Sequence, residues 1–318
     1  MTLDGLYVPL ITPFQDSGEV SLDALEGLAR RVLADGAAGL VALGTTGEPG
    51  SLDEAEKRAV VEVVARVCQE RSAPLLVGAN TVEALGRLGD RAFRNRAPET
   101  VAALTVVPPF VRPGEDGVVA YFTHLAATSP VPLVVYDVPL RTGQPLSAET
   151  LRRLAAIPGV VGIKSATGGI GDVVVELLAD PPAGFAILGG DDACLSPLLA
   201  MGAHGGVVAS ALVATAGFAR LIDVWRAGSV TEARDLGRRL ALLSLKLFAE
   251  PNPTVIKEVL HARGDIPSPS VRLPLLAAAP ATVVAALSAE ASATHPCRIM
   301  RWRDTYREDV HDGHRSPS

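Results

Sequence analysis

Short runs of apolar residues alternate with longer amphipathic stretches along the first two thirds of the chain. The runs are continuous rather than alternately apolar and polar, which is typical of parallel strands buried on both faces. The predicted strands are residues 6–11, 39–43, 75–79, 102–107, 133–138, 160–165, 186–190 and 206–210. The predicted helices between and after them are residues 21–35, 53–70, 82–95, 117–128, 147–156, 172–179, 194–201 and 212–227. Ser21 suits the N-cap of the first helix, and Ser51 or Asp53 that of the second.

Eight strand–helix units in succession predict a (β/α)8 barrel, a fold that typically takes about 250 residues. A doubly wound open sheet is the alternative, but no GxGxxG or Walker-type loop follows the first run. We therefore expect a barrel over residues 1–228, a helical extension over 229–290 and a polar, loosely ordered tail over 291–318. The extension contains three helical stretches, 231–250, 253–263 and 271–289. Its apolar run 275–289 is short for a bilayer span and is predicted to be a buried helix.

Charge and cysteine content narrow the class of protein. The 318 residues include 29 basic and 35 acidic side chains, for a net charge of −6, which does not favour nucleic acid or an anionic membrane as a partner. The three cysteines are far apart, so a disulfide framework is not expected. The first ten residues lack the basic segment of a signal peptide. We expect a soluble, cytoplasmic, globular protein.

Lysine is rare in this chain, and one lysine has an unusual position. Lys57, Lys246 and Lys257 lie in helical stretches among polar neighbours and are interpreted as ordinary surface residues. Lys164 instead ends an apolar predicted strand. Burial disfavours the ammonium form, and the neutral amine is the form that attacks a carbonyl group. The alternative is a structural ion pair with Asp191 or Asp192.

Other polar side chains also follow predicted strands, where the chemistry of a (β/α)8 barrel is located. Tyr136 could transfer protons, or it could only pack inside the barrel. The loop from Gly44 to Glu48 offers backbone N–H groups and two threonine hydroxyls to a carboxylate. Arg141 could bind a second carboxylate, or it could be solvated. The six histidines have no HxH or HExxH spacing, so a metal-dependent enzyme is not favoured.

Several motifs together resemble one known family. They are Gly44-Thr45-Thr46-Gly47-Glu48, Tyr136-Asp137-Val138-Pro139-Leu140-Arg141-Thr142-Gly143, Gly162-Ile163-Lys164-Ser165-Ala166-Thr167-Gly168, Gly190-Asp191-Asp192, Asn252-Pro253 with Lys257, and Arg272-Leu273-Pro274. The chain is similar over residues 6–276 to the dihydrodipicolinate synthase / N-acetylneuraminate lyase family of class I pyruvate-dependent aldolases. The context of Arg141 and Lys164 resembles the synthase branch.

This resemblance implies a role for each candidate residue. Lys164 would form a Schiff base with pyruvate, and Tyr136 would be its proton shuttle. Thr45 and Thr46 would bind the pyruvate carboxylate and position Tyr136, with Gly190 and the Val207 backbone along the same pocket. Arg141 would bind the carboxylate of the incoming aldehyde, which is aspartate semialdehyde in the synthases. The product would then be 4-hydroxy-tetrahydrodipicolinate, with neither metal nor cofactor required.

The chain departs from the family pattern after the fourth predicted strand. Family synthases carry a tyrosine there that reaches the neighbouring subunit and completes a proton relay, and Phe110 stands in its place. The resemblance still implies a homotetramer, a dimer of dimers, with Phe110 at an interface. Two alternatives remain open. One is an aldolase or dehydratase acting on a 2-keto-3-deoxy sugar acid or another 2-oxo acid, and the other is a catalytically reduced barrel that senses a 2-oxo acid.

Overall fold

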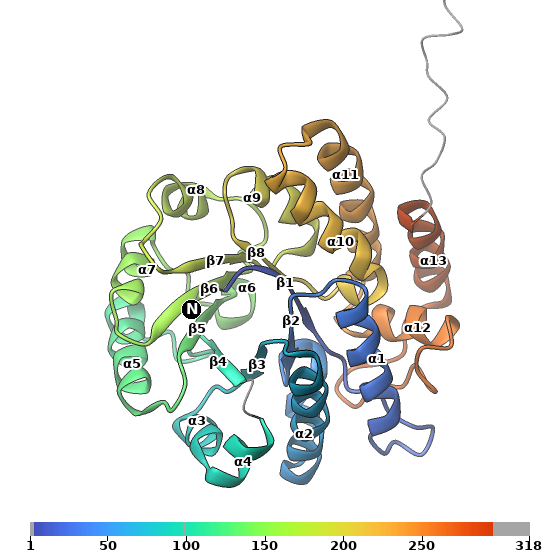
Figure 1. Cartoon of the computed structure of the whole chain (residues 1–318), viewed down its shortest axis with the longest axis horizontal. Coiled ribbons are helices and arrows are strands. Elements are labelled where there is room, and N and C mark those ends of the chain that lie inside the picture. The colour runs from blue at the N-terminus through green and yellow to red at the C-terminus, as the bar shows by residue number, and fades with distance from the viewer. Residues whose placement is uncertain (1–2, 98–99, 295–318) are drawn as a thin grey trace, which may run out of the picture.

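The structure, a computed structural model, describes residues 3–97 and 100–294. Parallel strands pair in chain order and the last pairs with the first, which closes a barrel (Figure 1). The strands are β1 (Gly5–Pro9), β2 (Gly39–Ala42), β3 (Leu75–Gly78), β4 (Thr100–Val106), β5 (Leu133–Asp137), β6 (Val160–Ser165), β7 (Ala186–Gly189) and β8 (Gly205–Val207). The predicted (β/α)8, or TIM-barrel, fold is confirmed.

Helices surround the barrel, and the later ones stack outside α1 and α10 (Figure 1). They are α1 (Leu22–Ala34), α2 (Glu54–Arg71), α3 (Val82–Gly89), α4 (Arg91–Arg96), α5 (Gly114–Thr128), α6 (Pro139–Thr142), α7 (Ala148–Ala155), α8 (Asp172–Ala179), α9 (Leu195–Ala200), α10 (Ala211–Arg226), α11 (Val230–Leu247), α12 (Thr254–Ala262) and α13 (Pro280–Thr294). Short 3₁₀ turns η1 (Thr45–Gly47), η2 (Pro49–Ser51) and η3 (Asp192–Cys194) lie after β2 and β7. Within the described residues, no helix is long and apolar enough to cross a membrane.

The continuous apolar runs form strands because both faces of each strand are buried. Val134, Tyr136 and Leu188 belong to the cluster inside the barrel. Their neighbours Val135 and Ile187 belong to the larger cluster between the barrel and its helices. Successive side chains of a strand point to opposite faces, so one residue of each pair enters each layer. Lys164 and Tyr136 therefore enter the barrel interior at its carboxyl end.

Some helices begin with a side-chain cap and others do not. Asp53 caps α2 through a complete capping box, in which its carboxylate accepts from Glu56 N and Glu56 accepts from Asp53 N. Ser21 is the N-cap residue of α1, but its side chain makes no capping bond and its Oγ accepts a bond from Gln15 instead. The choice between Ser51 and Asp53 is thus settled by the reciprocal bond that Asp53 and Glu56 make.

Several predicted boundaries were wrong. The helix predicted at 82–95 is two helices, because the backbone leaves the helical conformation at Asp90. The strand predicted to run into Ser210 ends at Val207. The stretch 271–289 is not one buried helix: α13 begins only at Pro280, and Leu273, Leu276 and Val284 are 78%, 72% and 64% exposed. Apolar character alone overstated the burial of this segment.

The extension and the barrel share one core. Leu240 and Val255, from α11 and α12, belong to the same buried cluster as Leu25 of α1. Helix α13 reaches Thr294, beyond the expected start of the tail at residue 291. The remainder of that tail, 295–318, lies outside the described residues.

Candidate active site

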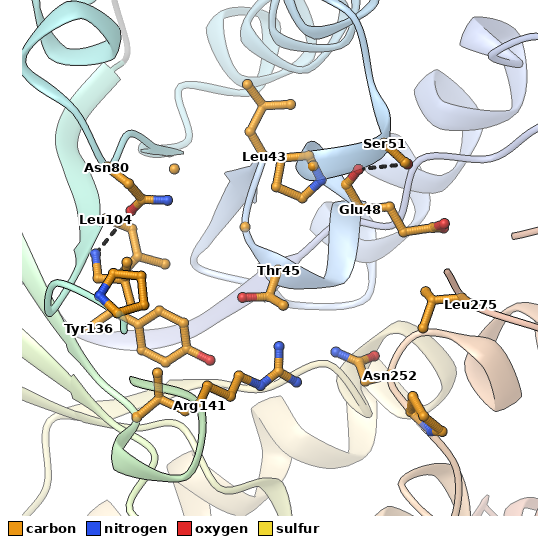
Figure 2. A pocket seen from close by; sticks show the side chains of 18 of the residues that line it. Leu43, Thr45, Glu48, Ser51, Asn80, Leu104, Tyr136, Arg141, Asn252 and Leu275 are labelled. Atoms are coloured by element: carbon orange, nitrogen blue, oxygen red, sulfur yellow. Dashed lines mark hydrogen bonds between the residues drawn. The ribbon is translucent and has the colours of Figure 1, made fainter. Parts of the chain in front are cut away.

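A pocket of about 530 Å³ opens at the carboxyl end of the barrel (Figure 2). Its walls come from the loops after β2 and β5 and from the C-terminal segments around Asn252 and Leu275. Figure 2 shows the side chains of Thr45, Tyr136 and Arg141 converging on one part of this pocket. The predicted clustering of these three residues is therefore seen in the structure.

Lys164 lies beside Tyr136 under this pocket. The two residues are paired in register across β5 and β6, and the Lys164 Nζ lies 4.3 Å from the centroid of the Tyr136 ring. Both side chains are nearly buried, at 8% and 9% exposure. No carboxylate of the described residues lies within ion-pair distance of Nζ, so the structural ion pair with Asp191 or Asp192 is not seen. The amine is next to a phenol rather than bound to a carboxylate.

Gly190 provides the space that the Lys164 side chain occupies. A Cβ atom at Gly190 would lie 2.9 Å from both Cγ and Cε of Lys164, and 2.9 Å from the carbonyl oxygen of Ser165. The Gly190 N–H donates to that same oxygen at 2.6 Å, which fixes the backbone. A glycine is required here because the lysine passes directly over it. This role differs from the substrate contact expected from the sequence.

The two threonines of the Gly44–Glu48 loop are in different environments. Thr45 lines the pocket, and its hydroxyl faces the Tyr136 hydroxyl (Figure 2). Thr46 is only 3% exposed and does not line the pocket, and its Oγ1 accepts a bond from Asn252 Nδ2 at 3.0 Å. The side chain of Thr46 therefore anchors the loop, and Thr45 is the residue that presents a hydroxyl to a ligand.

Arg141 is the cation that the pocket offers to an anionic ligand. It lies on the short helix α6, directly after β5, and its side chain is exposed on the pocket wall. Within the described part of the chain, no carboxylate pairs with its guanidinium. Figure 2 shows that group extending towards the space between Tyr136 and Asn252. An unpaired guanidinium in a pocket can bind a carboxylate through two parallel hydrogen bonds.

Two buried aspartates and one partly buried aspartate lie near the carboxyl end of the strand of Lys164. Burial, aided by the nearby Asp191 charge, raises the pKa of Asp137 to about 7, and Asp137 Oδ1 has no hydrogen-bond partner. Burial likewise raises the pKa of Asp192 to about 6, although Ser210 N–H donates to its carboxylate. Asp191 Oδ2 accepts from Gly168 N at 2.8 Å and Gly169 N at 3.1 Å. Asp191 thus holds the glycine loop that follows Lys164.

Lys257 was wrongly interpreted as a surface lysine. It is fully buried, and its Nζ lies 2.5 Å from Glu48 Oε1. The prediction was based on the polar neighbours of Lys257 in sequence. On helix α12, however, Lys257 belongs to the buried side of the helix, together with Ile256 and Leu260. That apolar face was the available signal. Glu48 lines the pocket, and the sequence had assigned it no role of its own within the Gly44–Glu48 motif.

Val207 and Phe110 lie away from the pocket wall. Val207 is fully buried inside the barrel, in the same cluster as Tyr136. Phe110 is 89% exposed on the rim, with a φ of 68° that is uncommon for an aromatic residue. Its neighbour Pro109 does line the pocket. The ring at position 110 is thus largely exposed and does not line the pocket.

These features define a class of protein: a TIM barrel whose carboxyl end holds a nearly buried lysine beside a tyrosine, with an arginine on the wall of the pocket above. The model of the dihydrodipicolinate synthetase family matches residues 2–288. The chain belongs to this family.

Named relatives agree with that assignment. The 4-hydroxy-tetrahydrodipicolinate synthase of Neisseria meningitidis serogroup B is 36% identical over 277 residues, which cover 86% of this chain and 93% of the relative. The structure of dihydrodipicolinate synthase from Thermotoga maritima has a TM-score of 0.85 and 27% identity, covering 92% of this chain and 99% of that one. The chloride-inhibited synthase from Acinetobacter baumannii, solved with pyruvate, has a TM-score of 0.82 and 32% identity, covering 91% of this chain and 99% of that one.

Proposed function

We propose that this protein condenses pyruvate with an aldehyde through a Schiff base on Lys164, with aspartate semialdehyde as the aldehyde and 4-hydroxy-tetrahydrodipicolinate as the product. The observation that carries the proposal is the pairing of Lys164 with Tyr136 at the carboxyl end of the barrel, with the Nζ 4.3 Å from the ring centroid. The relatives named as synthases, over most of both chains, support the same reaction.

The chemistry begins with the lone pair of the Lys164 amine. It adds to C2 of pyruvate, the carbonyl oxygen takes up protons and leaves as water, and an imine remains. Loss of a proton from C3 moves the C–H electron pair into an enamine. The enamine carbon then attacks the aldehyde carbon, a C–C bond forms, and the aldehyde oxygen becomes a hydroxyl. Attack on the imine carbon by water or by the amine of the product releases Lys164.

The surrounding groups have distinct tasks in these steps. The Tyr136 hydroxyl is placed to give and take the protons of imine formation, and Thr45 faces it across the pocket (Figure 2). The start of η1 supplies the carboxylate of pyruvate with backbone N–H groups and the Thr45 hydroxyl. Arg141, without an ion-pair partner in the described residues, binds the carboxylate of the aldehyde.

The test is reductive trapping with pyruvate and borohydride. Reduction of the imine leaves an N-(1-carboxyethyl) group on the lysine, which peptide mass spectrometry locates. We expect this group on Lys164 in the wild type and its loss in Lys164→Ala. The matched control is Lys246→Ala, because Lys246 is an exposed lysine on α11. Labelling that persists in Lys164→Ala would contradict the assignment.

We also propose that the protein is cytoplasmic and a homotetramer, a dimer of dimers. An exposed apolar rim supports the assembly of subunits. Phe110 and Val111 are 89% and 76% exposed and adjacent, on a segment whose Pro109 lines the pocket. Covering such side chains removes apolar area from water, and a second subunit at the rim would do so. Light scattering at micromolar concentration is expected to give the tetramer mass, and a monomer mass would refute this assembly.

The same rim keeps a second function under consideration, a barrel that binds a 2-oxo acid without rapid turnover. Phe110 has no hydroxyl, and its exposed ring does not line the pocket. An aldehyde screen after trapping separates the two functions: turnover with aspartate semialdehyde supports the synthase, and trapping without turnover of any aldehyde supports the sensor.

A further inference from the structure

The C-terminal extension contacts the Gly44–Glu48 loop beside the pocket, whose wall both of them form. Lys257 of α12 is fully buried, and its Nζ contacts Glu48 Oε1 at 2.5 Å and donates to Ser270 O at 2.9 Å. The same Nζ lies 4.0 Å from the centroid of the buried Phe14 ring. One ammonium group therefore joins α12, the segment before Arg272, the loop after β1 and the pocket wall.

Glu48 is fixed at both of its carboxylate oxygens. Its Oε2 accepts from Arg272 N at 3.0 Å, while Oε1 pairs with Lys257. The Arg272 guanidinium is itself bound to Glu56 at 2.6 and 2.7 Å and lies 4.4 Å from the Phe14 centroid. The carboxylate of Glu48 is therefore held between two segments of the extension, at Lys257 and at the Arg272 backbone.

The backbone of Glu48 transmits this position to the threonine turn. Glu48 has a φ of 53°, which a non-glycine residue seldom adopts, and its N–H donates to Thr45 O at 3.1 Å to close η1. A second tie comes from Asn252, whose Nδ2 donates to Thr46 Oγ1 at 3.0 Å. The turn that presents Thr45 to the pocket is thus held at Thr46 and at Glu48 by residues of the extension.

Stability alone does not explain the buried pair. Desolvation of the ammonium outweighs the attraction of Glu48 and lowers the pKa of Lys257 to about 8. A folded-state pKa below the unfolded value means that keeping the ammonium charged at neutral pH costs folding free energy. Apolar residues of similar size often pack as well as a buried ion pair, whereas an ion pair specifies one geometry.

We propose that Lys257 and Asn252 are positioning residues, which hold the Gly44–Glu48 loop in the conformation that receives the carboxylate of pyruvate. The inference rests on the proposed function for its ligand, and it goes beyond that function by assigning a role in substrate binding to the C-terminal extension. Neither residue touches the reacting atoms in this scheme. Their effect passes through Glu48 and Thr46.

The experiment compares Lys257→Met, Glu48→Gln, the double variant and Asn252→Ala with the wild type. Lys246→Met is the matched control, because it removes an exposed lysine from the neighbouring helix. Pyruvate is titrated in the borohydride reaction, which gives a half-saturating concentration and a saturated rate for each protein. Amide hydrogen exchange of residues 44–48 is measured without ligand, and thermal melting reports stability.

We expect each single variant to raise the half-saturating pyruvate concentration by about 10- to 100-fold, the effect of displacing a positioned group by up to about 1 Å. The saturated rate should change by less than about threefold, because Lys164 and Tyr136 keep their places. The double variant should lie closer to the wild type than Lys257→Met does, since it leaves no unpaired buried charge. Exchange of the loop amides should rise by about tenfold in the single variants.

A merely structural role would lower the melting temperature and leave the half-saturating concentration and the loop exchange unchanged, and that result overturns the inference. If Lys257→Met does not fold, Glu48→Gln, which keeps the shape of the side chain, and Asn252→Ala decide the matter. A wild type that fails to trap pyruvate would instead refute the proposed function. Hydrogen exchange of the loop would then still support or overturn the positioning role.

Discussion

Replacing Gly190 by alanine tests the proposed position of the reactive lysine. The new Cβ would lie 2.9 Å from Cγ and Cε of Lys164, whereas carbon atoms in optimal contact are roughly 3.5–4.0 Å apart. The lysine must therefore move by roughly 0.6–1 Å, since the Ser165 carbonyl on the other side belongs to the sheet backbone. A displacement of about 1 Å can cost on the order of 100-fold in rate, which is the loss we expect in pyruvate trapping.

The assay measures the rate of borohydride trapping at saturating pyruvate together with the free energy of unfolding. Overpacking of this kind typically costs about 1–3 kcal/mol of stability. Gly27→Ala is the control, because Gly27 lies exposed within α1 with open space around a Cβ, and the change should stabilise the helix by about 0.5–1 kcal/mol. Trapping by Gly27→Ala should equal that of the wild type.

A double variant separates steric displacement of Lys164 from a general disturbance of the barrel. In a Lys164→Ala background the contacts with the lysine are gone and the close contact with the Ser165 carbonyl oxygen remains, so Gly190→Ala should destabilise the protein less, with a coupling of about 1 kcal/mol. If Gly190→Ala traps pyruvate at the wild-type rate, Lys164 does not need the space that Gly190 leaves, and the proposed geometry of the reactive amine is refuted.

Three further predictions concern charge and proton transfer. The raised pKa of about 7 makes the wild type lose stability as the pH rises from 3.8 to about 7, and Asp137→Asn lacks this loss. The stability of Asp137→Asn relative to the wild type, measured by urea unfolding, should therefore be about 2–4 kcal/mol greater at pH 8 than at pH 4. Equal stability differences at the two pH values would contradict this. Arg141→Lys should leave pyruvate trapping unchanged and raise the half-saturating aldehyde concentration by about 10- to 100-fold in a steady-state assay, because a lysine cannot make the two parallel hydrogen bonds of a guanidinium to the aldehyde carboxylate. An unchanged half-saturating aldehyde concentration would show that Arg141 does not bind the aldehyde. Phe110→Tyr should raise the condensation rate by about tenfold or more, because it supplies the hydroxyl that the family tyrosine contributes to the proton relay. A variant no faster than the wild type in a steady-state assay would show that residue 110 takes no part in proton transfer.

The sequence predicted the barrel and the central site because both depend on local pattern. Short apolar runs such as 133–138 are typical of strands buried on two faces, and the residues that follow parallel strands meet at one end of the barrel. Tyr136, Lys164 and Arg141 were located by that rule alone. Their mutual distances were not, because the register between β5 and β6 cannot be read from either segment.

The rest of the site depended on contacts between distant segments. Lys257 lies in a helix with polar neighbours, and only its pairing with Glu48, far away in sequence, shows that it is a buried ammonium. The side chain of Thr46 looked equivalent to that of Thr45 until Asn252 was seen to bind it. The apolar run before α13 suggested burial, but Leu273 and Leu276 are largely exposed. A local pattern of hydrophobicity does not predict the burial of side chains whose partners come from another part of the chain.

The contacts of the extension also bear on the expected division at residue 228. A barrel that ended there would retain Lys164, Tyr136 and Arg141, but it would lose Asn252, Lys257 and the Arg272 backbone. Glu48 would then lose both partners of its carboxylate, and the hydroxyl of Thr46 would lose its donor. The turn after β2 would therefore lose the contacts that hold it in its present form. The residues that we propose as reactive come from the barrel strands, while the loop that we propose binds the substrate carboxylate is held by the extension. In this proposal the two regions form one functional unit.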